Sequence, residues 1–232
     1  MTTNNTRTTR NCSNDKGVIF FRGSMQCNVV LGCFLWVTYL VSYGQKITHK
    51  TLIDPETTSI HLNAANVYQV QLATRETKEM NIEAFIDGEY SGEQLVQITK
   101  NGGTSVVSVE FQPNFEMPND KLSAHKVLSV ALKIEVPQGK RFYLYGSEAN
   151  VSITGVYSHL KVVLNDGNCT LYHVQAPVVV QTQSGVITTK GAYATIEAFS
   201  KYGAVFGEAH TSGKYSYHLS TVTGNIYLNK TE

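Results

Sequence analysis

The sequence predicts an all-β protein: a single-stranded β-helix or solenoid with rungs of about 18 residues, preceded by a wider irregular β portion that caps it. Three observations lead to this fold class. From Phe142 onward, apolar residues recur every eighteen positions, glycines recur at the same spacing, and apolar and polar residues alternate between them. A fixed period with turn glycines is typical of repeats that stack on one another, and alternation is typical of half-buried strands.

The apolar columns identify the expected core. One column holds Phe142, Leu160, Val178 and Ile196 in chain order, and a three-residue insertion after Gly207 then brings Tyr217 into it. The inward positions of these strands form the predicted core, which comprises Leu144, Val151, Leu160, Val162, Cys169, Val180, Ile187, Val205, Leu219 and Ile226.

Residues 140–232 are therefore predicted to form regular rungs, with Gly167, Gly185 and Gly203 at equivalent turns. A single rung buries about four or five apolar side chains, which contribute roughly 1.5–3 kcal/mol each. Ordering its backbone costs about 1–2 kcal/mol per residue. A lone rung is therefore unstable, and we expect the rungs to fold together as one stack.

The preceding segment is expected to lead into this stack. Residues 45–56 are a short polar lead-in, and residues 57–139 hold longer, less regular strands within the same domain, 57–232. The triplet Asn101-Gly102-Gly103 is a strong hairpin signal, and the alternation from Val130 to Val136 predicts a strand. Because an open stack exposes unpaired backbone, we expect the irregular portion to cap the first rung.

Residues 1–44 are interpreted as a disordered leader followed by a signal peptide, with Met25 as a candidate start. Residues 29–41 are mostly apolar, and Ser42-Tyr43-Gly44 places small residues before a cleavage site at Gln45. Two alternatives remain open. The run could be a retained membrane anchor, although about 15 residues is short of the roughly 20 that a span needs. It could also be acylated at Cys33, although the apolar run continues past that residue.

Cleavage after Gly44 would leave Cys169 as the only cysteine, so no intramolecular disulfide is expected. Its place in an apolar column predicts a buried small hydrophobe rather than a reactive thiol.

Four bases and one acid lie within residues 1–44, and the remainder carries 15 bases and 17 acids. That balance predicts no nucleic-acid partner, and contact with a membrane only through an uncleaved signal segment.

The rung region also carries a family resemblance. A strand ending in Val136-Pro137 is followed by Phe142-x-Leu144 and by short repeats bearing Gly167, Gly185-Val-Ile187 and Gly224-Asn-Ile226. This pattern resembles the bacterial "putative adhesin" β-solenoid domains, including the head domain of auto-transporter adhesins, over roughly residues 57–230. The resemblance implies a secreted or surface β-helix of the cell envelope, and it implies no catalytic residues.

Few residues suggest chemistry. The chain has no G-x-S-x-G, H-E-x-x-H, P-loop or paired C-x-x-C motif. Glu148 and Asp166 lie eighteen residues apart, hence at similar corners of adjacent rungs, as a pair of glycosidase carboxylates would require; both flank turns, where acids commonly serve solvation. The histidines match no zinc spacing. We therefore predict no catalytic, cofactor-binding or metal-binding residues and no cofactor.

Tyrosines are frequent in the rung region, and on a flat β surface they can stack on sugars or pack on a protein partner. Strand propensity and capping of the last rung would explain many of them. Tyr143 and Tyr145 are the candidate ligand-surface residues, because Tyr143 lies between the inward-facing Phe142 and Leu144.

The predicted function is that of an exported, non-enzymatic β-solenoid with a structural or adhesin-like binding role at the cell envelope. It would be periplasmic, on the outer surface or extracellular, and its partner a surface glycan or an envelope protein. The alternatives are a small carbohydrate-active β-helix enzyme and a ligand-sensing domain.

Overall fold

The computed structural model describes residues 45–232, apart from 54, 89–90, 115–127, 209–211 and 230–232. The expected leader, the candidate start Met25 and the expected signal segment lie outside the described residues. Within the described ranges the protein is all-β, as predicted, and its one helical element is the short 3-10 turn η1 (Ser91–Glu93). No helix in this part of the chain is long and apolar enough to cross a membrane.

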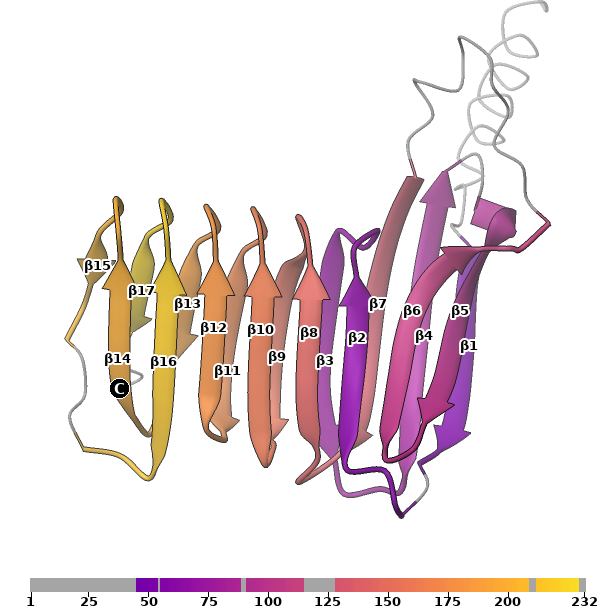
Figure 1. Cartoon of the computed structure of the whole chain (residues 1–232), viewed down its shortest axis with the longest axis horizontal. Helices are drawn as coiled ribbons and strands as arrows, with labels where there is room; N and C mark the ends of the chain where they lie inside the picture. The colour runs from indigo at the N-terminus through magenta and orange to yellow at the C-terminus, as the bar shows by residue number, and fades with distance from the viewer. Residues whose placement is uncertain (1–44, 54, 89–90, 115–127, 209–211, 230–232) are drawn as a thin grey trace, which may run out of the picture. The chain divides into compact units, whose positions relative to one another are not determined.

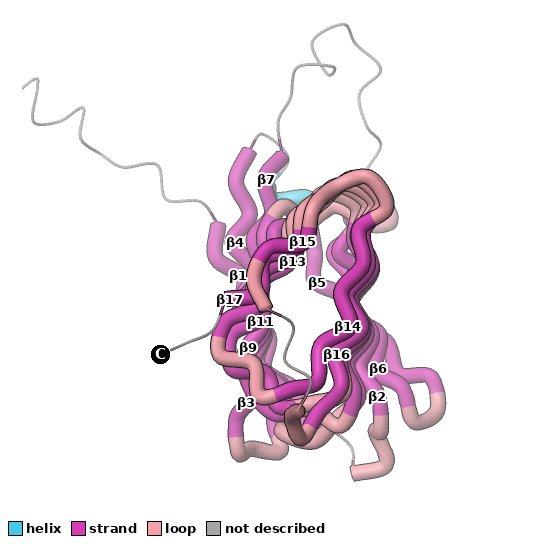
Figure 2. The backbone as a smooth tube through the Cα atoms, turned by 90° about the vertical axis from the view of Figure 1, so that its left-hand side faces the viewer, coloured by secondary structure: helices cyan, strands magenta, loops and turns pink. Residues whose placement is uncertain are grey.

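The strands form two mixed sheets whose inner faces enclose the core (Figures 1 and 2). The order in the nine-stranded sheet is β1 (Gln45–Leu52), β4 (Glu79–Gly88), β7 (Leu128–Pro137), β3 (Gln69–Arg75), β9 (Asn150–Val156), β11 (Cys169–Gln175), β13 (Ile187–Lys190), β17 (Ile226–Asn229) and β15 (Val205–Phe206). The order in the eight-stranded sheet is β14 (Ala194–Ser200), β16 (Tyr215–Thr221), β12 (Val178–Thr182), β10 (His159–Leu164), β8 (Arg141–Gly146), β2 (Ser59–Ala64), β6 (Thr104–Phe111) and β5 (Gln94–Asn101).

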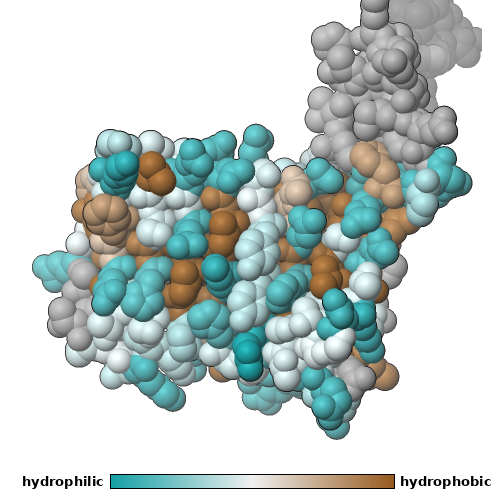
Figure 3. Space-filling view, viewed as in Figure 1, coloured by the Kyte–Doolittle hydropathy of each residue, from teal (hydrophilic) through white to brown (hydrophobic). Residues whose placement is uncertain are grey.

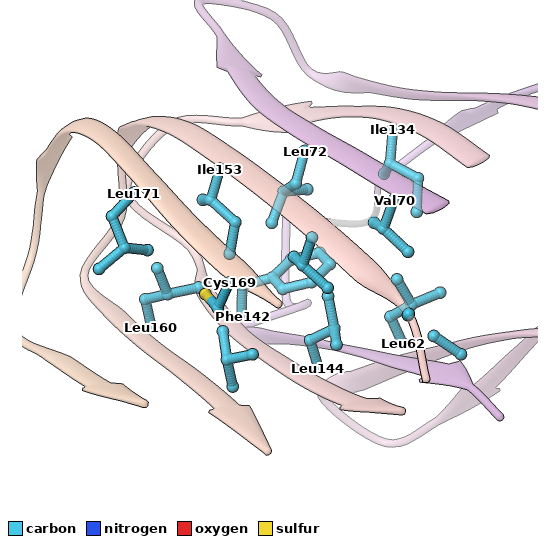
Figure 4. Packing of buried hydrophobic residues seen from close by; sticks show 14 of the residues in the cluster. Leu62, Val70, Leu72, Ile134, Phe142, Leu144, Ile153, Leu160, Cys169 and Leu171 are labelled. Atoms are coloured by element: carbon cyan, nitrogen blue, oxygen red, sulfur yellow. The ribbon is translucent and has the colours of Figure 1, made fainter. Parts of the chain in front are cut away.

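The eighteen-residue spacing of the sequence appears directly in the pairing of the central strands. β8, β10 and β12 are parallel, with Leu160 opposite Phe142 on one side and Val178 on the other. β9, β11 and β13 pair in the same way, with Cys169 between Val151 and Ile187. Because successive side chains alternate between the faces of a strand, these columns point from both sheets into one shared core (Figure 4).

The last two strands, β16 and β17, do not stack in chain order. We call each such pair, with one strand in each sheet, a coil. β16 lies between β12 and β14, and β17 lies between β13 and β15. The columns expected from the sequence therefore have the right register but the wrong order at this end. β16 and β17 bury Tyr217, Leu219, Ile226 and Leu228. Since burying larger apolar side chains is more favourable, this coil occupies the inner position and leaves β14 and β15 as the edge strands.

This exchange corrects one residue of the predicted core. Val205 is 41% exposed, because its strand β15 is the sheet edge and pairs only with β17. The other core residues named from the sequence are buried, namely Leu144, Val151, Leu160, Val162, Cys169, Val180, Ile187, Leu219 and Ile226.

Close stacking of the turns explains the recurrent glycines. A Cβ at Gly185 would overlap the carbonyl oxygen of Gly167, and a Cβ at Gly224 would overlap that of Gly185. A Cβ at Gly203 would likewise overlap the carbonyl oxygen of Gly224. The turns therefore tolerate no side chain at these positions, and their order, with Gly224 between Gly185 and Gly203, is the order of the coils.

The irregular portion extends both sheets. The predicted hairpin is present, since β5 and β6 pair antiparallel around Asn101 and Thr104. Residues 45–52, expected in a polar lead-in, form β1 instead, which pairs antiparallel with β4 and packs Ile47 against the core. The polar residues that alternate along β1 led to its interpretation as a lead-in. An edge strand needs only one apolar face, so such a sequence can still form a strand.

The stack begins earlier than residue 140. β2 pairs in parallel with β8, where Ile60 lies opposite Phe142, and β3 pairs with β9, where Val70 lies opposite Val151. β2 and β3 therefore form a coil continuous with the regular ones. A search at a fixed period misses this coil, because β4, η1 and β5–β7 are inserted between it and β8.

Candidate ligand surface

The outward face of β8 carries the two tyrosines singled out from the sequence. Phe142 and Leu144 point into the core and are fully buried, so the residues between and after them point outward. Tyr143 is half-buried and Tyr145 is 42% exposed. Figure 3 views this outer face of the eight-stranded sheet, where hydrophobic residues are scattered among hydrophilic ones.

Two histidines join these tyrosines in a row that crosses β2, β8 and β10. The register places His61 opposite Tyr143, and their ring centroids lie 4.6 Å apart at 54°. His61 also lies 6.5 Å from Tyr145, and His159 lies 6.0 Å from Tyr143 on the other side. Tilted ring pairs at such separations are favourable contacts. We call His61, Tyr143, Tyr145 and His159 the aromatic row.

The sequence indicated only half of this row. His159 lies eighteen residues after Arg141, so the regular spacing contained a signal for its position beside β8. His61 carried no such signal, because it precedes its partner by 82 residues and belongs to a coil outside the regular repeat. The row therefore depends on the parallel pairing of β2 with β8.

The two carboxylates considered for catalysis sit in stacked turns. Glu148 and Asp166 are both exposed. The backbone N–H of Asp166 donates to the carbonyl oxygen of Ser147 at 2.9 Å, and its carboxylate accepts a hydrogen bond from the Ser184 hydroxyl of the next turn. This side chain therefore links adjacent coils, a structural use that a turn acid can have without any substrate.

Cys169 is fully buried, and burial raises the pKa of its thiol to about 12. The thiolate is the reactive form of cysteine, so this side chain is protonated and inert at neutral pH.

In the described ranges, no group of three or more histidine, cysteine, aspartate or glutamate side chains could hold a metal ion. Of the histidines considered as metal ligands from the sequence, His210 lies outside those ranges.

A polar groove of about 480 Å³ lies over β3, β4 and β7 of the other sheet. Arg75 forms a 2.7 Å salt bridge with Glu135 within it, and Lys133 stands among further glutamates. The Oδ1 atom of Asn81 is buried there without a hydrogen-bond partner among the described residues. The groove has mixed charge and lacks the aromatic platforms of the β8 face.

Among the solved structures compared, one with a TM-score above 0.5 shows that the fold is shared. A "putative cell adhesion protein" from Clostridium sporogenes matches 81% of this chain and 100% of its own, with a TM-score of 0.59 and 16% identity. A "putative adhesin" from Bacteroides fragilis matches 80% and 97%, with a TM-score of 0.36 and 13% identity. Another from Parabacteroides distasonis matches 80% and 98%, with a TM-score of 0.37 and 8% identity. No protein-family model matches the chain, and no curated protein matches it either.

Proposed function

We propose that this protein is an exported, non-enzymatic β-solenoid with an adhesin-like binding role at the cell envelope, and that the aromatic row on β2, β8 and β10 is its ligand surface. The observation that carries the proposal is the 4.6 Å contact between His61 and Tyr143 beside the exposed Tyr145. Adjacent aromatic rings on an open sheet offer a platform for the apolar face of a sugar or for an apolar protein side chain.

The solenoid reading is supported by the eighteen-residue register of β8, β10 and β12, and by the turns that stack glycine on carbonyl. The likeness in fold to the Clostridium sporogenes protein supports an adhesin-like role. The aromatic row is open and crosses three strands, which suits an extended surface glycan or an envelope protein better than a small enclosed substrate.

A direct test is binding of the purified protein to a glycan array and to a panel of purified envelope proteins. We expect a ligand whose affinity falls at least tenfold in Tyr143→Ala and Tyr145→Ala. Tyr68→Ala is the matched control, because Tyr68 is similarly exposed, at 48%, and lies before β3 in the other sheet. Equal loss in the control, or full binding by both β8 variants, would refute the aromatic row as the ligand surface.

Export is tested separately. The apolar run and the Ser42-Tyr43-Gly44 triplet motivate cleavage after Gly44. Mass spectrometry of protein recovered outside the cytoplasm should find Gln45 at the N-terminus. Recovery of a chain that keeps the apolar run, in a membrane fraction, would instead favour the retained anchor.

A further inference from the structure

β11 contains an irregularity that the regular coils lack. Opposite β9, Tyr172 pairs with Thr154 but Gln175 pairs with Val156, so β11 has one extra residue. Within this bulge His173 has a φ of 46°, the only positive φ at a non-glycine among the described residues. Such backbone is uncommon outside glycine, although histidine adopts it more readily than most residues, and a bulge re-aims a side chain.

In the neighbouring coil, a glycine at position 191 leaves space for the His173 imidazole. A Cβ at Gly191 would overlap the Cε1 and Nδ1 atoms of His173, and Gly191 itself has a φ of 64°. Only glycine allows both this backbone and this approach. Two unusual backbone conformations on adjacent coils therefore meet at one imidazole ring, which remains exposed on its other side.

A pocket of about 320 Å³ opens beside this ring. It is lined by the buried Val174 and by His173, Gln175, Gly191, Tyr193, Lys214 and Tyr215. Tyr193 is 74% exposed, and the Nζ of Lys214 lies 5.4 Å from the ring centroid of Tyr215. Among the described residues, the lining contains a lysine, a histidine, a carboxamide and two phenol rings, and no acid.

This lining identifies the chemistry of a ligand. The volume is at the small end of ligand pockets, and suits one ring rather than a long chain. The exposed phenol of Tyr193 can stack on the apolar face of a pyranose, Gln175 can pair with hydroxyl groups, and Lys214 is the cation for a carboxylate. β11 is paired on both sides, by β9 and β13, so its backbone is closed to strand addition by a peptide.

We propose that this pocket binds the carboxylate-bearing sugar of an acidic glycan, such as a hexuronate or a sialate. Tyr193 stacks on the sugar ring, Lys214 and His173 face the carboxylate, and Gln175 hydrogen-bonds a hydroxyl group. The site is formed by β11, β16 and the residues between β13 and β14, and does not include the aromatic row. Whether this pocket binds an acidic sugar therefore does not depend on whether the aromatic row on β8 binds a ligand.

The test is a calorimetric or NMR titration of the whole purified protein with methyl glucuronide, methyl galacturonide and sialic acid, beside the neutral methyl glucoside and galactoside. We expect saturable binding of at least one acid, and at least tenfold weaker binding of its neutral counterpart. Lys214→Ala and Tyr193→Ala should each weaken binding at least tenfold, and Lys214→Arg should restore most of the affinity.

The matched control is Lys201→Ala. Lys201 also lies over a tyrosine, with its Nζ 4.9 Å from the ring centroid of Tyr202, but it does not line the pocket. Lys201→Ala should leave binding unchanged. Equal binding of neutral sugars, displacement by acetate as effective as by the uronate, an equal loss in Lys201→Ala, or unchanged affinity in Lys214→Ala would each overturn the proposal. Thermal unfolding of every variant distinguishes loss of the site from loss of the fold.

Discussion

Val178 and Ile196 lie eighteen residues apart in the sequence but are not neighbours in the sheet, because Tyr217 lies between them. Tyr217 pairs with Val178 on one side and with Ile196 on the other. Its ring is buried, and its hydroxyl donates a hydrogen bond of 2.5 Å to the carbonyl oxygen of Val174 in the opposite sheet. The last coil is thus inserted between two earlier strands of each sheet, rather than added to the end of the stack, and the hydrogen bond of Tyr217 holds it there.

Tyr217→Phe tests this hydrogen bond. The change keeps the ring but leaves the Val174 carbonyl without this donor, and a buried polar group that loses its partner costs about 1–3 kcal/mol. We expect the free energy of unfolding in urea to fall by that amount. Tyr193→Phe is the control, since its side chain is exposed and should change stability by less than about 0.5 kcal/mol. Equal stability of the two variants would contradict the structural role of the hydroxyl group.

Gly185→Ala tests the stacking of the turns. The added methyl group would overlap the carbonyl oxygen of Gly167, so adjacent coils must separate. Overpacking of this kind costs up to about 3 kcal/mol, and we expect a clear drop in the thermal midpoint. Gly92→Ala is the control, because nothing lies within 4 Å of its Cβ position. A midpoint for Gly185→Ala as high as that of the control would show that the turns are looser than described.

Cys169→Asp tests the core column. The carboxylate would be placed between Val151 and Ile187, with no charged partner in either position. Burial of an unpaired charge is among the most destabilising changes, and we expect a loss of at least about 4 kcal/mol or failure to fold. Cys169→Ala should keep the fold with a smaller loss. Circular dichroism of the two variants would decide, and a folded, stable aspartate variant would be incompatible with the burial of this site.

The pH dependence of stability follows from the same thiol. Burial raises the pKa of Cys169 from 9.0 to about 12, so above pH 9 the unfolded chain releases a proton that the folded protein keeps. The contribution of this group to stability should therefore be level below pH 9 and fall as the pH rises from there toward 12, by up to about 1.4 kcal/mol per pH unit.

Tyr157 and Tyr217 act in the same direction at higher pH, because burial raises their pKa values above the usual 10.0. In Cys169→Ala the decline should therefore begin about one pH unit later, near pH 10. Urea titrations from pH 7 to 11 measure both curves. Identical curves for the two proteins would mean that the thiol is not buried in the folded state.

Glu148→Gln and Asp166→Asn test the enzymatic alternative. Both acids lie in exposed turns, and the Asp166 carboxylate already accepts a hydrogen bond from Ser184. We expect the protein to cleave no polysaccharide, and both variants to fold and bind as the parent does. Release of reducing sugars by the parent protein, lost in either variant, would establish catalysis at this pair.

Much of the local structure could be read from the sequence. Alternation assigns Leu160 and Val162 to the inner face, and the eighteen-residue spacing assigns Cys169 its neighbours, because both patterns are set by strand geometry within a few residues. The hairpin at Asn101 is likewise a local turn preference. For the aromatic row, the sequence indicated Tyr143 and Tyr145, which needed only the knowledge that Phe142 and Leu144 point inward.

Other features were decided only by the tertiary structure. Two coils share one register after β12, and which of them lies inside depends on the apolar surface that each buries: Tyr217 and Leu219 take the inner place, and Val205 is left at the edge. The contact of His61 with Tyr143 depends on pairing across 82 residues, and the setting of His173 depends on a glycine in the next coil. Local sequence determines which face of a strand is buried; competition among whole coils for the same core determines which strands become neighbours.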